Sequence, residues 1–324
     1  MRKLLSGLLT AAVIAAVCLA GLELMLQVYV TAIAKRGKLF DYDVQAGWRT
    51  LPNLDLVRRN AAGQDWRIET DSAGLRTFSS EPASDRRNLL ILGDSFAFGE
   101  GVMLQDRFDA RIRTARPELN VVNTGTMGYG TDQEYVIARP FLDDLHPGDA
   151  ILVLLYANDF YDVLRKDFVL RSKPYFVRDG DQWRLHNPHI GWFEWLRDRS
   201  YLISIAGELS EALRGSAWDF DAAQSIVTHI LERIEAEKPA SVPVVLAYHG
   251  RSSKIPWPPN IRMSELCAHI TLCVDLDPVL DQKTDFLPDG HWTPDGHRKV
   301  GDRLTAVLND LQRCGPSSCA SAAQ

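Results

Sequence analysis

The chain has 324 residues and a formal net charge of −6, and apolar residues make up 46 % of it. That apolar share supports a sizeable core and excludes global disorder. The acidic balance leaves no basic footprint for nucleic acid, so no nucleic-acid partner is expected.

The first 36 residues are predicted to lie outside the globular domain. An uncharged stretch from Leu4 to Leu22 is long enough to cross a bilayer core. Glu23 interrupts it, and apolar character resumes from Leu24 to Ala34. A signal peptide usually has a shorter apolar region, so we expect an uncleaved membrane anchor, with cleavage after Ala34 as the alternative. Basic residues flank both ends, which leaves the orientation open under the positive-inside rule.

Residues 40–313 are predicted to form the main domain. Residues 40–80 favour short strands and turns. An alternation of strands and helices then begins, and apolar runs separated by helices indicate a parallel sheet covered on both faces. We expect strands at 88–92, 121–123, 149–156, 242–248 and 270–274, with helices at 108–115 and 132–142.

A candidate nucleophile follows the first core strand, in Gly93-Asp94-Ser95. Ligands bind at the carboxyl ends of the strands of an open α/β sheet. A serine there exposes its hydroxyl beside backbone N–H groups, an arrangement that suits attack on an ester carbonyl. Alone, the tripeptide is equally typical of a turn with a helix N-cap.

Two further strand ends carry candidate donors for an oxyanion. Gly128 lies in the glycine-rich loop after residues 121–123, and Asn158 follows the strand 149–156. With the backbone N–H of Ser95, the Gly128 N–H and the Asn158 amide would form an oxyanion hole. Taken singly, Gly128 could be a turn glycine, and Asn158-Asp159 could be an Asx turn that ends the strand.

Residues 164–220 break the α/β rhythm and are predicted to be an insertion. The segment Tyr175–Leu185 is typical of a hairpin around Asp179-Gly180. Aromatic residues at 192–195 and an amphipathic stretch at 202–213 follow. We expect the insertion to roof the site. Alternatives are a surface against a membrane or partner and an aromatic platform for a sugar.

Four cysteines form two local pairs, Cys267 with Cys273 and Cys314 with Cys319. An even count in local pairs suits disulfides in an oxidising compartment. The spacings of six and five depart from the usual zinc pattern, so no metal is expected, and free structural thiols are the other alternative.

The candidate base lies near the end of the domain, in Asp289-Gly290-His291. A serine nucleophile needs a base within hydrogen-bond reach, and histidine suits that role near neutral pH. Asp289 is two positions away and can orient the imidazole from the same loop. A helix is expected to start near Pro294, with His297 in its first turn as a structural residue.

These motifs together resemble the SGNH (GDSL-type) hydrolases. The resemblance covers roughly residues 85–310 and rests on Gly93-Asp94-Ser95, Asn123 to Gly128, Asn158-Asp159 and Asp289-Gly290-His291. It implies a three-layer α/β/α flavodoxin-like fold with a short parallel sheet, Ser95 as nucleophile, Gly128 and Asn158 in the oxyanion hole and His291 as base. The common family pattern has an acidic residue three positions before the histidine, where this chain has Pro288. An Asp-x-His variant fits Asp289, with Asp285 as a less favoured substitute.

The anchor and the segments at 47–53 and 70–76 also resemble a membrane-anchored bacterial branch of that family. We therefore expect an extracytoplasmic, periplasmic serine esterase that acts on a short-chain acyl ester and needs no cofactor. One alternative is an O-acyltransferase that moves acetyl groups onto an exported polysaccharide, with an acylated saccharide as partner. The other is a non-catalytic carbohydrate-binding or assembly module. Residues 314–324 are expected to be a tail.

Overall fold

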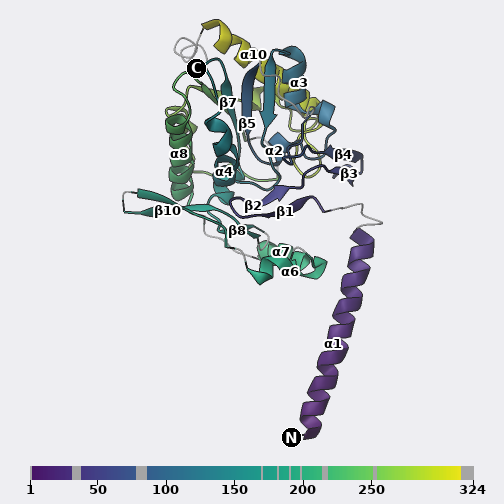
Figure 1. Ribbon diagram of the computed structural model, residues 1–324. Helices are drawn as coiled ribbons and strands as arrows, with labels where there is room; N and C mark the ends of the chain where they lie inside the picture. Colours follow the sequence, from purple (N-terminus) through teal and green to yellow (C-terminus); the bar gives the residue numbers. More distant parts are fainter. Residues whose placement is uncertain are drawn as a thin grey trace.

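A five-stranded parallel sheet forms the centre of the fold (Figure 1). The computed structural model describes residues 2–30, 38–77, 86–168, 171–180, 182–189, 191–197, 199–213, 218–250 and 254–314. The strand order is β13-β12-β7-β5-β6. The strands are β5 (Arg87–Leu92), β6 (Leu119–Asn123), β7 (Ala150–Tyr156), β12 (Val244–His249) and β13 (Leu272–Asp275). The chain leaves β5 for β6 on one side and then crosses to β7 on the other, so the direction of winding reverses between β5 and β7. This is the flavodoxin-like order.

Helices cover both faces of the sheet and complete three layers. On one face lie α3 (Phe108–Ala115) and α10 (Pro294–Cys314), which pack on Leu89, Ile91 and Leu152. On the other face lie α4 (Thr131–Leu142) and α8 (Phe220–Glu237), which pack on the alternate strand residues. Because both faces are covered, the strands are apolar throughout rather than alternating. The expected three-layer α/β/α fold is confirmed.

Helix α8 was absent from the sequence-based elements, although its pattern is regular. Its buried residues recur at helical spacing, from Ala223 through Val227 and Ile230 to Ile234. Asp219 precedes it, and the Asp219 side chain accepts a hydrogen bond from the N–H of Ala222. Both a helical period and an N-cap were therefore present in a segment that follows the predicted insertion and had no predicted element.

The segment before the sheet forms two hairpins, which agrees with the short strands and turns predicted for residues 40–80. They comprise β1 (Phe40–Asp43) with β2 (Gly47–Thr50), and β3 (Asp55–Arg59) with β4 (Asp65–Glu69). After β4, the buried guanidinium of Arg76 donates hydrogen bonds to the backbone carbonyls of Phe98, Gly99 and Val102 at 2.6–3.0 Å. The amino-terminal hairpins are thus tied to the segment that follows Ser95.

The insertion contains β8 (Asp167–Phe168), β9 (Arg171–Ser172), β10 (Tyr175–Asp179), β11 (Gln182–His186), α6 (Trp192–Arg197) and α7 (Tyr201–Leu213). Strands β10 and β11 are antiparallel, and Asp179 pairs with Gln182, so the predicted hairpin is confirmed. Helices α6 and α7 lie on the side of the domain from which α1 projects (Figure 1).

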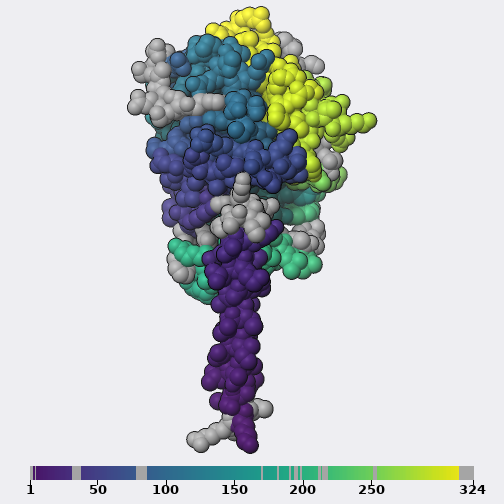
Figure 2. All heavy atoms as spheres, turned by 90° about the vertical axis from the view of Figure 1, so that its right-hand side faces the viewer, coloured from purple at the N-terminus to yellow at the C-terminus, as the bar shows by residue number. Residues whose placement is uncertain are grey.

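Helix α1 (Arg2–Val28) extends away from the rest of the chain (Figure 2). Its segment Leu5–Val28 has a mean hydropathy of 2.3 and is long and apolar enough to cross a membrane. A signal sequence shares these properties.

Cys267, at the end of α9 (Met263–Cys267), forms a disulfide with Cys273 in β13. This pairing confirms one of the two expected disulfides and rules out the zinc alternative for these two sulfurs. Cys319 and the side chain of Cys314 lie outside the described residues.

Candidate active site

Ser95 is the first residue of the short helix α2 (Ser95–Phe98), at the carboxyl end of β5. Gly93 makes this abrupt turn from strand to helix possible, because a Cβ there would lie 2.6 Å from Cβ of Ala97. The side chain of Asp94 caps α2 by accepting a hydrogen bond from the N–H of Phe96 at 2.8 Å. The N–H of a first helical residue has no partner within its helix, so the Ser95 N–H is available to an anion beside its hydroxyl.

His291 reaches Ser95 from the other end of the domain. Its Nε2 lies 2.8 Å from Oγ of Ser95, so the two side chains share a hydrogen bond. Oδ1 of Asp289 lies 3.3 Å from Nδ1 of the same imidazole and also accepts a hydrogen bond from the backbone N–H of His291 at 3.2 Å. The structure therefore places Asp289, rather than another acid, beside the second ring nitrogen.

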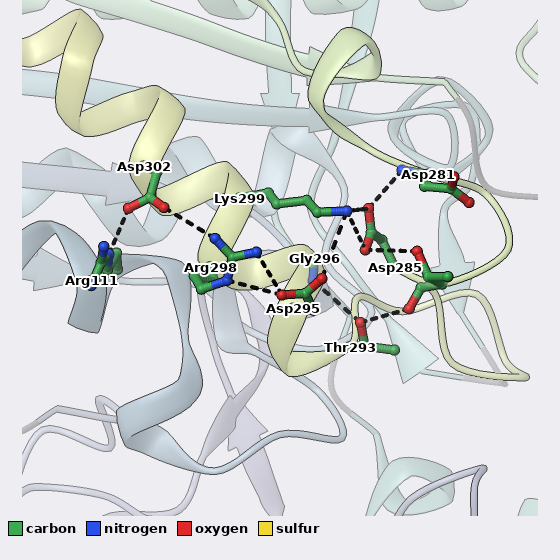
Figure 3. A network of polar contacts seen from close by, with 10 residues as sticks. Arg111, Asp281, Asp285, Thr293, Asp295, Gly296, Arg298, Lys299 and Asp302 are labelled. Carbon is green, nitrogen blue, oxygen red and sulfur yellow. Dashed lines mark hydrogen bonds and ion pairs between the residues drawn. The ribbon is translucent and has the colours of Figure 1, made fainter.

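Asp285, the less favoured alternative to Asp289 as the acid beside His291, instead contacts residues of the surrounding fold (Figure 3). Its buried carboxylate binds Nζ of Lys299 on α10 at 2.7 and 2.9 Å and accepts the N–H of Asp281 at 2.6 Å. The backbone carbonyl of Asp285 accepts the N–H of Thr293 at 2.9 Å. Figure 3 shows how this cluster continues along α10 through the ion pairs of Arg298. Asp285 thus anchors the loop that carries His291 to the start of α10.

The two remaining candidate donors line the same cavity as Ser95 and His291. Gly128 has a φ of +78°, which favours glycine, and the preceding residue Met127 is fixed by a 3.2 Å hydrogen bond from the Trp48 indole to its carbonyl. Asn158 lies just beyond β7, and its Nδ2 donates to Oδ2 of Asp162 at 3.1 Å. The structure therefore gathers all five predicted site residues around one cavity.

Two residues in or near the predicted motifs, His297 and Asp159, are not among the residues that line the cavity. His297 is buried, and its Nδ1 accepts the N–H of Phe108 at 3.3 Å. Asp159 is buried behind Asn158, where it accepts the N–H of Tyr156 at 2.8 Å and the hydroxyl of Thr131 at 3.1 Å. These contacts are not those of an Asx turn, in which the side chain accepts the N–H two positions later, and Asn158 is half-buried in the wall of the cavity.

Glu100 is a site residue that sequence reasoning missed. Its Oε2 lies 3.3 Å from Nε2 of His291, so it faces the nitrogen that contacts Ser95. The backbone around Glu100 is held by the Arg76 contacts to Gly99 and Val102. A carboxylate five residues after the candidate nucleophile was the available signal, but nothing in its spacing singled it out.

The charge state of His291 follows from its neighbours. Burial lowers the pKa of His291, but the charge of Glu100 and the contact with Asp289 outweigh burial and raise that pKa to about 9. Burial also raises the pKa of Glu100. The imidazole is consequently mostly protonated at neutral pH when Glu100 is ionised.

A second group of acids is buried next to the cavity and includes Asp162, which lines it. Burial raises the pKa of Asp162 to about 7 and raises the pKa values of Glu134 and Asp159 well above their usual range. Lys173, from the insertion, forms a buried ion pair with Asp132 and donates to the carbonyl of Asp162 at 3.1 Å. The amide of Asn158 therefore donates its hydrogen bond to Asp162, a carboxyl group whose pKa is raised to about 7.

The cavity has a volume of about 570 Å³ and is largely aromatic beyond the polar centre. The ends of the insertion contribute Arg165, Phe168, Arg171 and Trp218 to its walls, whereas no described residue of β10, β11, α6 or α7 is among those that line it. The expectation that the insertion roofs the site stays a prediction. Trp192, from the aromatic stretch, is 77 % exposed and does not line this cavity. Among the described residues, no group of three His, Cys, Asp or Glu side chains is placed to hold a metal ion.

Comparison with known proteins gives distant structural likenesses. Neither a family model nor a curated protein matches the chain. A member of the lipolytic G-D-S-L family from Veillonella parvula has 12 % identity and a TM-score of 0.43, covering 69 % of this chain and 100 % of its own. The psychrotrophic esterase EstA from Pseudoalteromonas has 12 % identity and a TM-score of 0.41, covering 70 % and 99 %. AlinE4, an SGNH-hydrolase family esterase, has 18 % identity and a TM-score of 0.34, covering 72 % and 100 %.

Proposed function

We propose that this chain is a serine ester hydrolase of the SGNH type. The observation that carries the proposal is the 2.8 Å contact between Oγ of Ser95 and Nε2 of His291, formed where β5 ends at the reversal point of the sheet. A hydroxyl in contact with an imidazole, with N–H donors from residues of the same cavity, is the arrangement that nucleophilic acyl transfer requires.

The reaction proceeds in two halves. His291 takes the Ser95 proton while Oγ attacks the acyl carbonyl, and the resulting oxyanion accepts hydrogen bonds from the N–H groups of Ser95 and Gly128 and from the Asn158 amide. The C–O bond to the alcohol then breaks, and His291 returns its proton to the departing alkoxide. In the second half His291 deprotonates water, which attacks the acyl-enzyme. The bond from the acyl carbon to Oγ of Ser95 then breaks, His291 returns its proton to that Oγ, and the acid is released.

Asp289 orients the imidazole through Nδ1 and stabilises the imidazolium that forms in each half. Glu100 acts on the other side of the ring. Because its charge favours the protonated imidazole, the base is most effective where the pH is high enough to leave His291 neutral.

We further propose that α1 is an uncleaved anchor and that the catalytic domain is extracytoplasmic, in the bacterial periplasm. The length and hydropathy of Leu5–Val28 support the anchor. The Cys267–Cys273 disulfide supports an oxidising compartment, because cytosolic proteins rarely keep such bonds. We place the membrane anchor in residues 1–36, the hydrolase domain in 40–313 and a tail in 314–324.

The test of the proposed chemistry uses a fluorophosphonate probe and p-nitrophenyl acetate on the full chain in detergent. We expect wild type and Ser72→Ala, whose serine lies in an exposed turn, to be labelled and to hydrolyse the ester. Ser95→Ala should lose both properties. Labelling that persists in Ser95→Ala, or fails in wild type, would count against the proposal. Adding an acetyl-acceptor oligosaccharide distinguishes transfer from hydrolysis by the product formed.

A further inference from the structure

One face of α7 carries a row of exposed apolar side chains. Ile205, Leu209 and Leu213 are 47 %, 58 % and 75 % exposed, and their spacing of four residues places them on one side of the helix. Trp192, at the start of α6, is 77 % exposed. Figure 2 shows green atoms of this part of the insertion on either side of the upper end of the purple helix α1. Contiguous apolar surface of this kind usually marks an interaction site.

Glu23 joins α7 to α1. One oxygen of its carboxylate accepts the hydroxyl of Ser200 at 2.9 Å and the N–H of Leu202 at 3.1 Å, and the other accepts the N–H of Tyr201 at 2.9 Å. A carboxylate at a helix N-terminus is favourable because it satisfies free N–H groups and the helix dipole. An ionisable residue in an apolar span is costly, and the start of α7 supplies its partners.

This contact sets the depth of α7 along the axis of α1. Glu23 precedes Val28, the last residue of the candidate membrane span Leu5–Val28, by five positions, which is about 7.5 Å of helix at 1.5 Å per residue. Amphipathic helices that lie in a bilayer interface bury their apolar face to about 5–10 Å. The start of α7 is therefore at interfacial depth if α1 spans the bilayer.

We propose that α7 and the start of α6 lie in the interface of the same lipid bilayer that α1 spans, with Glu23 holding α7 at that level. The occupant of the apolar face is lipid, because the face is continuous with the spanning segment and is attached to it by the hydrogen bonds of Glu23. This inference rests on the anchoring proposed above.

A second cavity connects this surface with the candidate active site. It has a volume of about 910 Å³, and its walls include Leu26 and Tyr29 near the end of α1, Ile205 of α7, and Glu100 and Asp289 beside His291. It shares Phe40, Phe168 and Arg171 with the catalytic cavity. An ester-bearing amphiphile that stays partly in the bilayer could thus reach Ser95 along one continuous wall, so the proposed surface also favours that substrate class.

The surface is tested with the full chain in nanodiscs of phosphatidylethanolamine and phosphatidylglycerol that contain a phosphatidylcholine with a diazirine in its acyl chain. After irradiation, peptides are mapped by mass spectrometry. We expect lipid adducts on α7 as well as α1, and few on the β3–β4 hairpin, which exposes Val57 as an internal control. Labelling of α7 no greater than that of β3–β4, or cross-links from α7 to a second copy, would overturn the proposal.

Variants separate this surface from the proposed chemistry. Leu209→Gln/Leu213→Gln should lose most α7 labelling and slow the hydrolysis of a bilayer-borne ester, while p-nitrophenyl acetate hydrolysis and Tm stay unchanged. Val57→Gln should change none of these. Glu23→Ala should reduce the labelling of α7 but not of α1, and equal labelling of α7 would contradict the role of Glu23. If wild type fails to hydrolyse p-nitrophenyl acetate, the esterase proposal fails, whereas lipid labelling still decides the surface.

Discussion

Glu100 and Ser95 meet the same nitrogen of His291, at 3.3 Å from Oε2 and 2.8 Å from Oγ respectively. In the proposed mechanism a carboxylate there stabilises the imidazolium that forms in each half of the reaction, but it also favours the protonated form of the resting imidazole. The proposed base therefore has one partner, Ser95, that requires the neutral imidazole, and another, Glu100, that favours the imidazolium.

Glu100→Gln should lower the pKa of His291 from its value of about 9, because it removes the nearest negative charge on Nε2. Activity requires neutral His291, so the acidic limb of the kcat/KM profile should move to lower pH. While that pKa stays above 7, lowering it by about one pH unit increases the neutral fraction at neutral pH roughly tenfold. The control is Glu232→Gln, a half-exposed acid on α8. An acidic limb that stays in place would contradict the assigned role of Glu100.

Asp289→Asn should reduce kcat about 10²- to 10⁴-fold with little change in Tm, because an amide next to Nδ1 no longer stabilises the imidazolium. Steady-state kinetics with p-nitrophenyl acetate and thermal melting measure the two effects. An Asp289→Asn variant with wild-type kcat would remove Asp289 from the proposed triad.

Asp285→Asn should give the opposite pattern. It weakens a buried carboxylate's pairing with Lys299, whose side chain is 27 % exposed, so we expect a loss of about 1–3 kcal/mol in the free energy of unfolding. Activity at temperatures well below Tm should largely remain. A fall in kcat as large as that of Asp289→Asn, without a fall in stability, would reverse the two assignments.

Asn158→Ala should reduce kcat about 10²- to 10³-fold and leave KM nearly unchanged, because the lost amide hydrogen bond is strongest to the oxyanion of the transition state. Fluorophosphonate labelling, slower than in wild type but not abolished, checks that Ser95 and His291 remain in contact. A change confined to KM would instead indicate that Asn158 binds the ground-state substrate.

Asp162 should make stability depend on pH. Its pKa is raised from 3.8 to about 7 in the folded protein, so the folded state binds the proton more tightly. The stability of the protonated form is fully present below pH 3.8 and is lost as pH rises through about 7. Asp162→Asn should flatten this part of a Tm-against-pH curve, whereas the exposed Asp144→Asn should leave it unchanged. An unaltered slope in Asp162→Asn would assign the dependence to Glu134 or Asp159.

The elements that the sequence predicted well are those with a strong local signal. The strands β5 and β7 are continuous apolar runs that end in Gly93 and Asn158, and α3 was placed at its observed bounds. The contact of Ser95 with His291 followed from chemistry, because a nucleophile needs a base, and the resemblance gave the order of the partners. Local pattern and chemical requirement agreed at these positions.

Contacts that depend on tertiary placement had no such signal. Glu100 has an unremarkable neighbourhood in the sequence, and tertiary contacts such as those of Arg76 hold the segment that brings it to His291. Asp285 and Asp289 are both acids near His291, and the position of Lys299 on α10 decides which of them faces the imidazole. Likewise, Glu23 appeared only as an interruption of an apolar run, because its partners at the start of α7 lie 177 positions or more along the chain.

The Arg76 clamp has a consequence for how this site can change. Arg76 binds the carbonyl oxygens of Phe98, Gly99 and Val102, so its hydrogen bonds do not involve the side chain at position 100. Position 100 can therefore be varied in a library while the backbone that presents it keeps its course. Because the backbone at this edge of the candidate site is fixed through main-chain hydrogen bonds, substitutions at position 100 offer a route to variants with a different pH optimum and with the other candidate site residues unchanged.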